Sequence, residues 1–160
     1  MRKQLGMAAL GLLAMAGCSR SDGTLEPGEW ELVYEITDVT APPDWPPDVI
    51  ASMKQAKDSA RKCITPEEAR APGAGALLVS HDPACKFSDV SMAGGKFRGR
   101  MECAGGNAMG KVTMTMEGRY EARSYEITGR TSVDNPGAPW AFASRTTGRR
   151  LGNCPAGKKG

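Results

Sequence analysis

The chain has 160 residues, which is enough for one domain with a modest hydrophobic core. Its formal net charge of +3 comes from 21 basic and 18 acidic residues, and it falls to +1 if Arg2 and Lys3 are removed with an N-terminal signal. A balance so close to neutrality gives no reason to expect nucleic-acid binding.

The N-terminus has the features of a bacterial lipoprotein signal peptide. Two basic residues precede an apolar run over residues 5–16, which is too short to cross a bilayer permanently. Met15-Ala16-Gly17-Cys18 then resembles a lipoprotein cleavage site, although Met15 replaces the more usual Leu. We expect residues 1–17 to be removed and Cys18 to be acylated; an ordinary cleaved secretory peptide is the alternative.

Residues 18–26 predict a short tether between this lipid and a single folded domain over residues 27–154. Ser19, rather than Asp, follows Cys18, which by resemblance to proteobacterial lipoproteins favours the outer membrane. We therefore expect a lipid-anchored protein on the periplasmic face of the bacterial cell envelope. Residues 155–160 are expected to be a frayed tail.

The first element of the domain is predicted to be a strand over residues 29–37. Apolar and acidic side chains alternate there, as in a half-buried antiparallel strand, with one face formed by Trp30, Leu32, Tyr34 and Ile36. A loop over residues 41–47 follows, because four prolines exclude regular structure.

Helical patterns come next in the chain. From Asp48 to Lys62 the apolar period indicates one amphipathic helix. Thr65-Pro66-Glu67-Glu68 has the pattern of a capping box with proline at the first helical position, so a short helical turn should follow. Residues 76–80 are apolar and predict a short strand that leads into the next element.

Residues 85–103 predict a β-hairpin. Gly94 and Gly95 tolerate the positive φ of a tight loop, and a three-residue loop over 93–95 places Cys85 opposite Cys103. A two-residue loop of Gly94 and Gly95 would place Cys103 opposite Lys86 and would turn side chains to the wrong face. We therefore predict the longer loop and a disulfide between Cys85 and Cys103.

Three further strands complete the expected sheet. They are predicted over residues 111–117, over residues 120–131 with a bulge near Ser124, and from Trp140 onward. Gly118 is expected to form a turn between the first two. The fold class is thus α+β and β-dominated: a curved, mostly antiparallel sheet of six or seven strands, with one amphipathic helix packed on it.

The cysteine count supports both the lipid anchor and a pair of disulfides. Five cysteines less an acylated Cys18 leave an even set of four, in an oxidising compartment. If Cys85 pairs with Cys103, the second disulfide is Cys63–Cys154.

Motifs that could carry catalysis lack the chemistry that they need. Gly105–Lys111 fits the start of a phosphate-binding loop, but Val112 stands where Ser or Thr would bind magnesium. His81, the only histidine, has no nucleophile elbow beside it, and the four cysteines after Cys18 are expected to pair in disulfides. We predict a non-enzymatic protein with no catalytic residue, no cofactor and no metal.

Apolar residues give two binding alternatives. Met92, Met101, Met109, Met114 and Met116 offer soft ligands for Cu(I), although methionine also fills irregular cores, which we favour here. A curved sheet lined by aromatic and methionine side chains could instead enclose a small apolar ligand. The candidate ligand-binding residues are Trp30, Tyr34, Met114 and Met116; a filled core is the alternative that we favour.

Several short sequences, taken in order, resemble one family. They are Pro27-Gly28-Glu29-Trp30-Glu31, Cys63-Ile64-Thr65-Pro66-Glu67-Glu68-Ala69, the Gly94-Gly95 pair between Cys85 and Cys103, and Gly148-Arg149-Arg150-Leu151-Gly152-Asn153-Cys154. Over about residues 25–154 the chain is similar to small proteobacterial envelope proteins of the domain-of-unknown-function 3617 family. The resemblance implies a periplasmic or lipoprotein location and paired cysteines, and it brings no catalytic residues.

Three functions follow as expectations. The leading one is a non-enzymatic structural or interaction module of the envelope, with a patch near Trp45 as the surface for an envelope protein partner. The second is a carrier of a small apolar ligand inside the curved sheet. The third is an envelope hydrolase, for which the sequence supplies no nucleophile and base. The expected partners are the membrane, through the lipid, and no nucleic acid.

Overall fold

The structure is a computed structural model that describes residues 24–79, 84–104 and 110–156. The signal peptide, Cys18, His81 and Met109 lie outside these residues. So do most of the tether, of the phosphate-loop-like segment and of the C-terminal tail.

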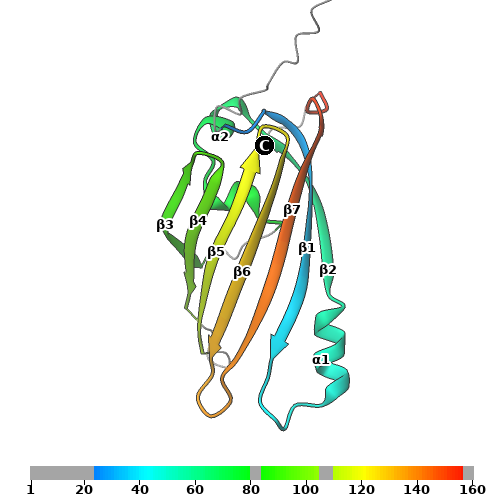
Figure 1. Ribbon diagram of the computed structural model, residues 1–160, viewed down its shortest axis with the longest axis vertical. Helices are drawn as coiled ribbons and strands as arrows, with labels where there is room; N and C mark the ends of the chain where they lie inside the picture. Colours follow the sequence, from blue (N-terminus) through cyan, green and yellow to red (C-terminus); the bar gives the residue numbers. More distant parts are fainter. Residues whose placement is uncertain (1–23, 80–83, 105–109, 157–160) are drawn as a thin grey trace, which may run out of the picture.

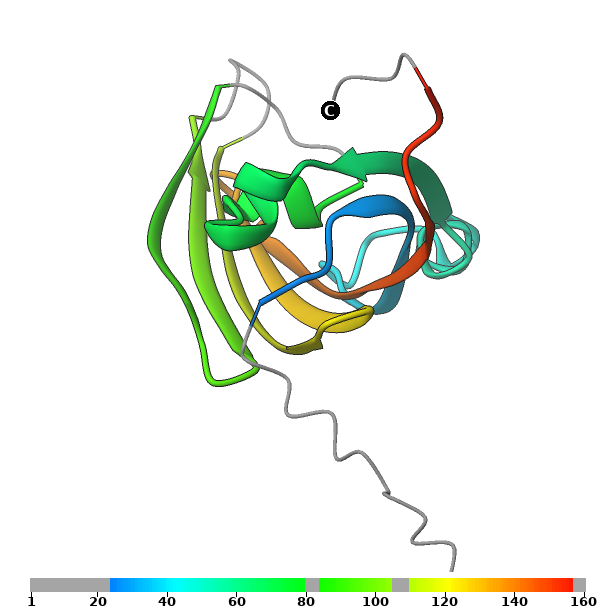
Figure 2. The ribbon, with the colours of Figure 1, turned by 90° about the horizontal axis from the view of Figure 1, so that it is seen from above.

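The described chain forms one open sheet of seven antiparallel strands, in the order β2-β1-β7-β6-β5-β4-β3 (Figure 1). This confirms the β-dominated fold class. The strands are β1 (Gly28–Thr40), β2 (Lys57–Ile64), β3 (Cys85–Ala93), β4 (Lys96–Cys103), β5 (Lys111–Glu121), β6 (Ser124–Asp134) and β7 (Trp140–Gly152). Seen from above, the sheet curves around two short helical segments, α2 (Pro66–Arg70) and η1 (Ala74–Leu77) (Figure 2).

Strict alternation of burial along β6 shows which face of the sheet is inside. Tyr125, Ile127, Gly129, Thr131 and Val133 are buried, and the residues between them are exposed. Because successive side chains of a strand point to opposite faces, one face of the sheet carries the core and the other meets water. The buried side chains lie on the concave face.

The predicted helix over residues 48–62 is wrong in its second half. Helix α1 spans only Pro47–Lys54, and the residues after it form β2, which pairs with β1 from Glu35↔Lys57 to Gly28↔Ile64. The apolar period of residues 48–62 fits a helix. Pairing with β2, however, satisfies the backbone hydrogen-bonding groups along one side of β1, and such pairing overrides a weak local preference for helix. Helix α1 buries none of its residues and lies beyond the end of β2 (Figure 1), not on the face of the sheet.

The hairpin of β3 and β4 uses both registers that the sequence allows. Cys85 lies opposite Cys103 and Phe87 opposite Met101, as predicted, but Met92 pairs with Phe97 across a two-residue loop of Gly94 and Gly95. A β-bulge between Ser88 and Ser91, where Asp89 has a φ of 53°, changes one register into the other. The predicted three-residue loop is therefore wrong, although the predicted disulfide is present.

Two other expected boundaries are also wrong. Gly118 lies inside β5, and the chain turns at residues 122–123, so that Ser124 begins β6 and is not a bulge. A Cβ atom on Gly118 would come within 2.3 Å of the Glu126 carbonyl oxygen, so this glycine permits a close approach of backbone to backbone. Residues 74–77, part of which were expected in a strand, form the 3₁₀ turn η1.

One half of the concave face is filled by a packed core. The fully buried side chains there are Trp30, Leu32, Ile64, Leu77, Phe97, Met116 and Ile127. The ring of Trp30 stacks on Tyr125 with 5.7 Å between centroids, and the Tyr125 ring covers Gly148, where a Cβ atom would clash with it. The Tyr125 hydroxyl donates to the carbonyl oxygen of Leu77 at 2.9 Å, which fixes η1 over the sheet.

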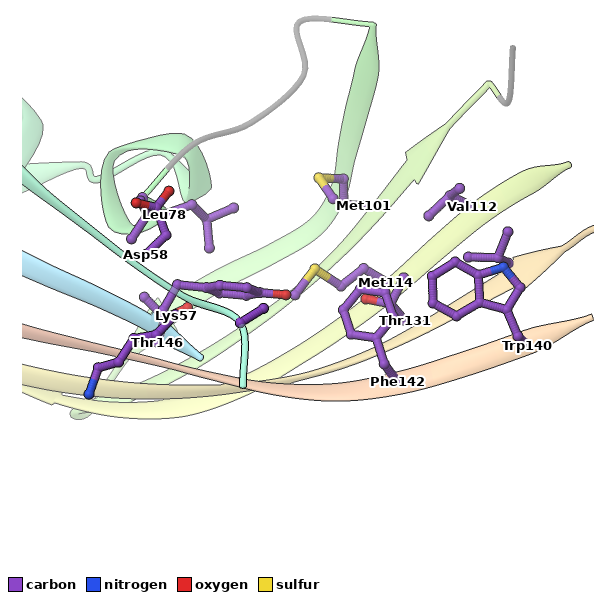
Figure 3. A pocket seen from close by; sticks show the side chains of 14 residues that line it. Lys57, Asp58, Leu78, Met101, Val112, Met114, Thr131, Trp140, Phe142 and Thr146 are labelled. Carbon is purple, nitrogen blue, oxygen red and sulfur yellow. The ribbon is translucent and has the colours of Figure 1, made fainter. Parts of the chain in front are cut away.

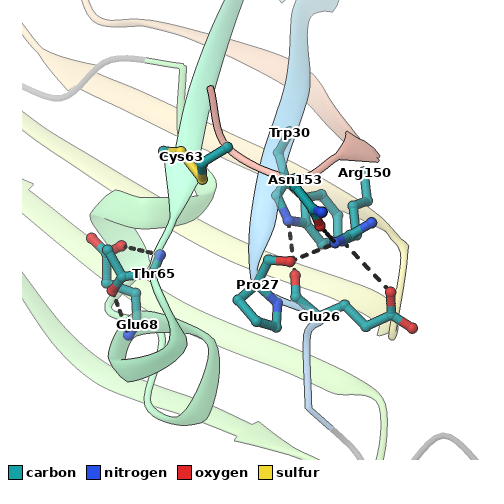
Figure 4. The surroundings of a disulfide bond; sticks show 9 residues. Glu26, Pro27, Trp30, Cys63, Thr65, Glu68, Arg150 and Asn153 are labelled. Carbon is teal, nitrogen blue, oxygen red and sulfur yellow. Dashed lines mark hydrogen bonds and ion pairs between the residues drawn. A yellow bond between two sulfur atoms is a disulfide. The ribbon is translucent and has the colours of Figure 1, made fainter. Parts of the chain in front are cut away.

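The segments before β1 and after β7 are fixed beside this core (Figure 4). The disulfide Cys63–Cys154 joins β2 to the segment after β7, in the pairing that the sequence predicts. The capping box forms, with Thr65 Oγ1 accepting from the Glu68 amide at 3.2 Å and Glu68 Oε2 accepting from the Thr65 amide at 2.8 Å. The indole Nε1 of Trp30 donates to the Glu26 carbonyl oxygen at 3.0 Å.

Candidate ligand-binding site

The other half of the concave face holds a cavity of about 480 Å³ (Figure 3). Its floor consists of inward side chains of four adjacent strands, β1, β7, β6 and β5, and its cover comes from the segment after η1 and from the start of β2. The floor residues are Tyr34, Val112, Met114, Thr131, Val133, Trp140, Phe142 and Thr146; the rest of the lining is Ala56, Lys57, Asp58, Leu78, Val79 and Met101.

Strand register places the floor residues in rows. Thr131 lies opposite Phe142 on one side and opposite Met114 on the other, and Met114 lies opposite Met101. The next row joins Trp140, Val133 and Val112. Six residues separate Trp140 from Thr146 along β7, so the floor is roughly 20 Å long at the usual strand rise. The cavity is therefore an elongated trough.

One end of the trough is aromatic. Trp140 stacks on Phe142 with 5.5 Å between ring centroids, and Trp45 packs on Trp140 at 5.4 Å. Trp45 comes from the proline-rich segment that follows β1. The prolines hold that segment in an extended or turn conformation, which lets it cross the end of the sheet.

Two hydroxyl groups on the concave face have no hydrogen-bonding partner within the described residues. They are Thr131 Oγ1 and Ser144 Oγ, on side chains that are 4% and 2% exposed. Thr131 lines the cavity, whereas Ser144 lies on the same face of the sheet, beside Gly129 and the tip of Met114. A buried polar group without a partner costs free energy, so this pair is an exception that calls for an explanation.

Titratable groups are sparse around the cavity. Burial raises the pKa of Tyr34, and the nearby Ser144 hydroxyl lowers it in part, although the two oxygens do not meet the geometry of a hydrogen bond. A raised pKa keeps the Tyr34 hydroxyl neutral and able to donate. Lys57 and Asp58 are exposed at the mouth, but the Lys57 ammonium lies 3.9 Å from Glu35, whose side chain is on the outer face.

Lys62 secures the cover of the cavity. Its ammonium donates to the carbonyl oxygen of Leu78 at 2.5 Å. Burial lowers the pKa of Lys62, and the charge of Glu68 opposes that shift. Together with the hydrogen bond from Tyr125 to Leu77, this contact holds the cover to the sheet at two adjacent carbonyl groups.

The four predicted ligand-binding residues divide between the two halves of the sheet. Tyr34 and Met114 line the cavity, whereas Trp30 and Met116 are enclosed in the packed core. Sequence reasoning did not select Thr131, and the signal was present: it is a hydroxyl-bearing residue at an inward position of an otherwise apolar alternation.

Of the methionines considered as Cu(I) ligands, Met101 and Met114 lie opposite each other and line the cavity, whereas Met92 and Met116 belong to the packed core or pack against it. Within the described residues, no three His, Cys, Asp or Glu side chains are grouped so that they could hold a metal ion. Glu31 and Glu35 on β1 pair with Arg149 and Arg145 on the outer face. None of the helices in the described segments is long and apolar enough to span a membrane.

Comparison with known proteins gives one match. Residues 25–154 match the model of the family described as protein of unknown function (DUF3617). No curated protein and no solved structure matches the chain. We therefore infer the function of this chain from the structure of its concave face.

Proposed function

We propose that this chain, which belongs to the DUF3617 family of proteins of unknown function, binds and carries a small apolar ligand without transforming it. The observation that carries the proposal is the trough of about 480 Å³ between the sheet and its cover. Ligand sites in proteins typically have volumes of roughly 300–1,000 Å³, apolar walls and a few polar groups. The trough has all three properties.

The contrast with a filled core supports this proposal. The same sheet packs completely around Trp30 and Phe97, so its curvature does not by itself leave a gap. In the other half, Trp140 and Phe142 remain partly exposed, although aromatic side chains gain most from burial. A ligand in the trough would complete their burial.

An interaction module has less support. The large apolar side chains that are exposed in the described residues are Val49 on α1 and Val90 on β3. These elements lie at opposite edges of the sheet (Figure 1), so the two side chains do not form a patch. Trp45, the expected docking residue, packs on Trp140 at the end of the trough.

We also propose that the carrier is an envelope lipoprotein, anchored through Cys18 with its domain on the periplasmic side. The signal-like N-terminus and the two disulfides support an oxidising compartment. Membrane fractionation of cells that express the wild type or Cys18→Ser tests the anchor. Retention of the variant in the membrane fraction would contradict it.

A fluorescent apolar probe tests ligand binding. The unreduced protein, carrying Cys18→Ser so that no acyl chain is attached, is titrated with N-phenylnaphthylamine, whose emission rises on leaving water. We expect saturable binding at one site. Val112→Phe fills part of the trough and should weaken binding about tenfold or more, because overpacking costs about 1–3 kcal/mol.

The matched control is Val90→Phe, the same change at an exposed position on β3. It should leave probe binding unchanged. Absence of saturable binding to the parent protein, or equal losses in both variants, would refute the carrier proposal.

A further inference from the structure

The geometry points to a ligand of one class: a neutral, elongated apolar molecule whose carbonyl or ester oxygen, away from both of its ends, accepts a hydrogen bond from the hydroxyl of Thr131. This inference rests on the proposed carrier function and specifies the ligand. It starts from the position of Thr131 on the floor, since Figure 3 shows this side chain together with Met114 and Phe142, between Trp140 and Thr146.

The place of Thr131 along the trough determines where the oxygen lies in the ligand. Thr131 pairs with Phe142, two residues from Trp140 and four from Thr146. At the usual strand rise this leaves about 7 Å of floor on one side and about 14 Å on the other. A polar group at the end of a chain would not reach Thr131 while the chain filled the floor on both sides.

The unpaired Thr131 hydroxyl indicates that the ligand carries a hydrogen-bond acceptor. The side chain is 4% exposed, and its oxygen has no partner among the described residues. A buried hydroxyl without a partner is unfavourable, whereas an incoming acceptor would satisfy its O–H without needing a water molecule. A carbonyl oxygen is such an acceptor, and a pure hydrocarbon is not.

The tip of the Met114 side chain lies close to Ser144, and Met114 lies opposite Thr131 on the neighbouring strand. The methyl carbon at the tip of its side chain lies 2.3 Å from where a Cβ atom of Gly129 would stand, and Ser144 Oγ lies 2.8 Å from the same point. The methionine side chain is unbranched and adopts many shapes at small cost. Rotation of this thioether would open the floor to an oxygen of the ligand.

The charges around the trough exclude an ionic ligand. Lys57 and Asp58 are the charged residues in the lining, and both are exposed at its mouth. In Figure 3 the Lys57 ammonium points away from the other labelled side chains. A carboxylate placed on the floor would lose its hydration without gaining a cation, at a cost far above that for a neutral oxygen.

Three linear probes of equal carbon number test the inference by competition with N-phenylnaphthylamine: dihexyl ketone, tridecane and tridecanoate. Dihexyl ketone should bind about three- to tenfold more tightly than tridecane. This ratio of affinities corresponds to the net free energy of one hydrogen bond. Tridecanoate at neutral pH should bind more weakly than the ketone. Thr131→Val should abolish the preference by weakening ketone binding while leaving tridecane binding unchanged.

Two variants control for structural damage. Thr131→Ser keeps the hydroxyl and should keep the preference. Thr128→Val removes a hydroxyl on the outer face of the same strand, where it donates to the Glu117 carbonyl oxygen, and should change none of the three affinities.

The outcomes separate the ligand class from the carrier function. If the wild type binds ketone and tridecane equally, or if Thr131→Val weakens both, the ligand class is wrong and the carrier proposal stands. Tightest binding of tridecanoate would also overturn the neutral class. If the fluorescent probe itself does not bind, the carrier proposal fails together with this inference. If the probe binds and the ketone does not displace it, the ligand class is wrong.

Discussion

The two halves of the concave face are built from the same strands, but one half is a packed core and the other holds a cavity. On β6, Tyr125 and Ile127 belong to the packed core, whereas Thr131 and Val133 line the trough. Gly129 lies between them. The difference arises outside the sheet, because α2 and η1 contribute Ala69 and Leu77 to one half and the described chain places no helix over the other. A curved sheet thus defines a concave surface, and the segments that cross it decide how much becomes core.

Truncating one tryptophan in each half should give the largest difference between them. Trp30→Ala should destabilise the protein by about 3–5 kcal/mol, because the fully buried ring leaves a cavity in close-packed surroundings. Trp140→Ala should cost only about 1–2 kcal/mol, since its ring is partly exposed and borders a space that already exists. Urea unfolding measures both. Equal losses would mean that the trough is as tightly packed as the core.

Removing one hydroxyl from each half should give effects of opposite sign. Tyr125→Phe should cost about 1–3 kcal/mol, because it leaves the Leu77 carbonyl oxygen without its donor in a buried site. Thr131→Val should leave the free energy of unfolding unchanged or raise it by about 1 kcal/mol, since the hydroxyl that it removes has no partner. Thermal unfolding of the ligand-free variants checks the signs. Clear destabilisation by Thr131→Val would show that its hydroxyl is satisfied.

The smallest expected effect is the acid response of an ion pair on the outer face. Hydrogen bonding and charge from Arg145 lower the pKa of Glu35 below its usual value of 4.5, so the unfolded state takes up the proton first. The pair therefore stabilises the fold above pH 4.5, and this contribution is lost as the pH falls through the folded pKa. Glu35→Gln should make stability less dependent on pH in that range.

Added salt should reduce the difference in pH dependence between the wild type and Glu35→Gln, because the ion pair is exposed to solvent. The matched control is Glu121→Gln, which removes a carboxylate at the exposed end of β5. If both variants respond to acid alike, the pairing with Arg145 contributes nothing. Unfolding midpoints measured in urea from neutral pH down to about pH 3 decide the matter.

Patterns that involve one strand or one turn could be predicted from the sequence. The inward face of β1, the capping box at Thr65 and the disulfide Cys85–Cys103 all follow from spacing within short segments. β2 could not be predicted in this way, because residues 57–62 also fit a helical period and only their pairing with β1 decides between the two. The bulge at Asp89 was missed because we expected one register along the whole hairpin, whereas the hairpin changes from one register to the other at the bulge.

The candidate site was predictable only in part. Alternation places Tyr34 and Met114 on the inner face, but it places Trp30 and Met116 there as well. Which inward residues are covered depends on where η1 lies, and that depends on contacts from Tyr125 and Lys62 to carbonyl groups distant in the sequence. Periodicity within a strand carries no information about such contacts.

The two disulfides have a consequence for aggregation. In the sheet as described, β2 and β3 are the edge strands, and each contributes one cysteine to a disulfide: Cys63 and Cys85. An open sheet presents unpaired backbone groups at its edges, where other chains can add, and edge strands are also the first to fray. A covalent bond at each edge limits fraying and so protects the sheet against edge-to-edge association. We therefore expect reduction of the two disulfides to make edge-to-edge association of the open sheet easier.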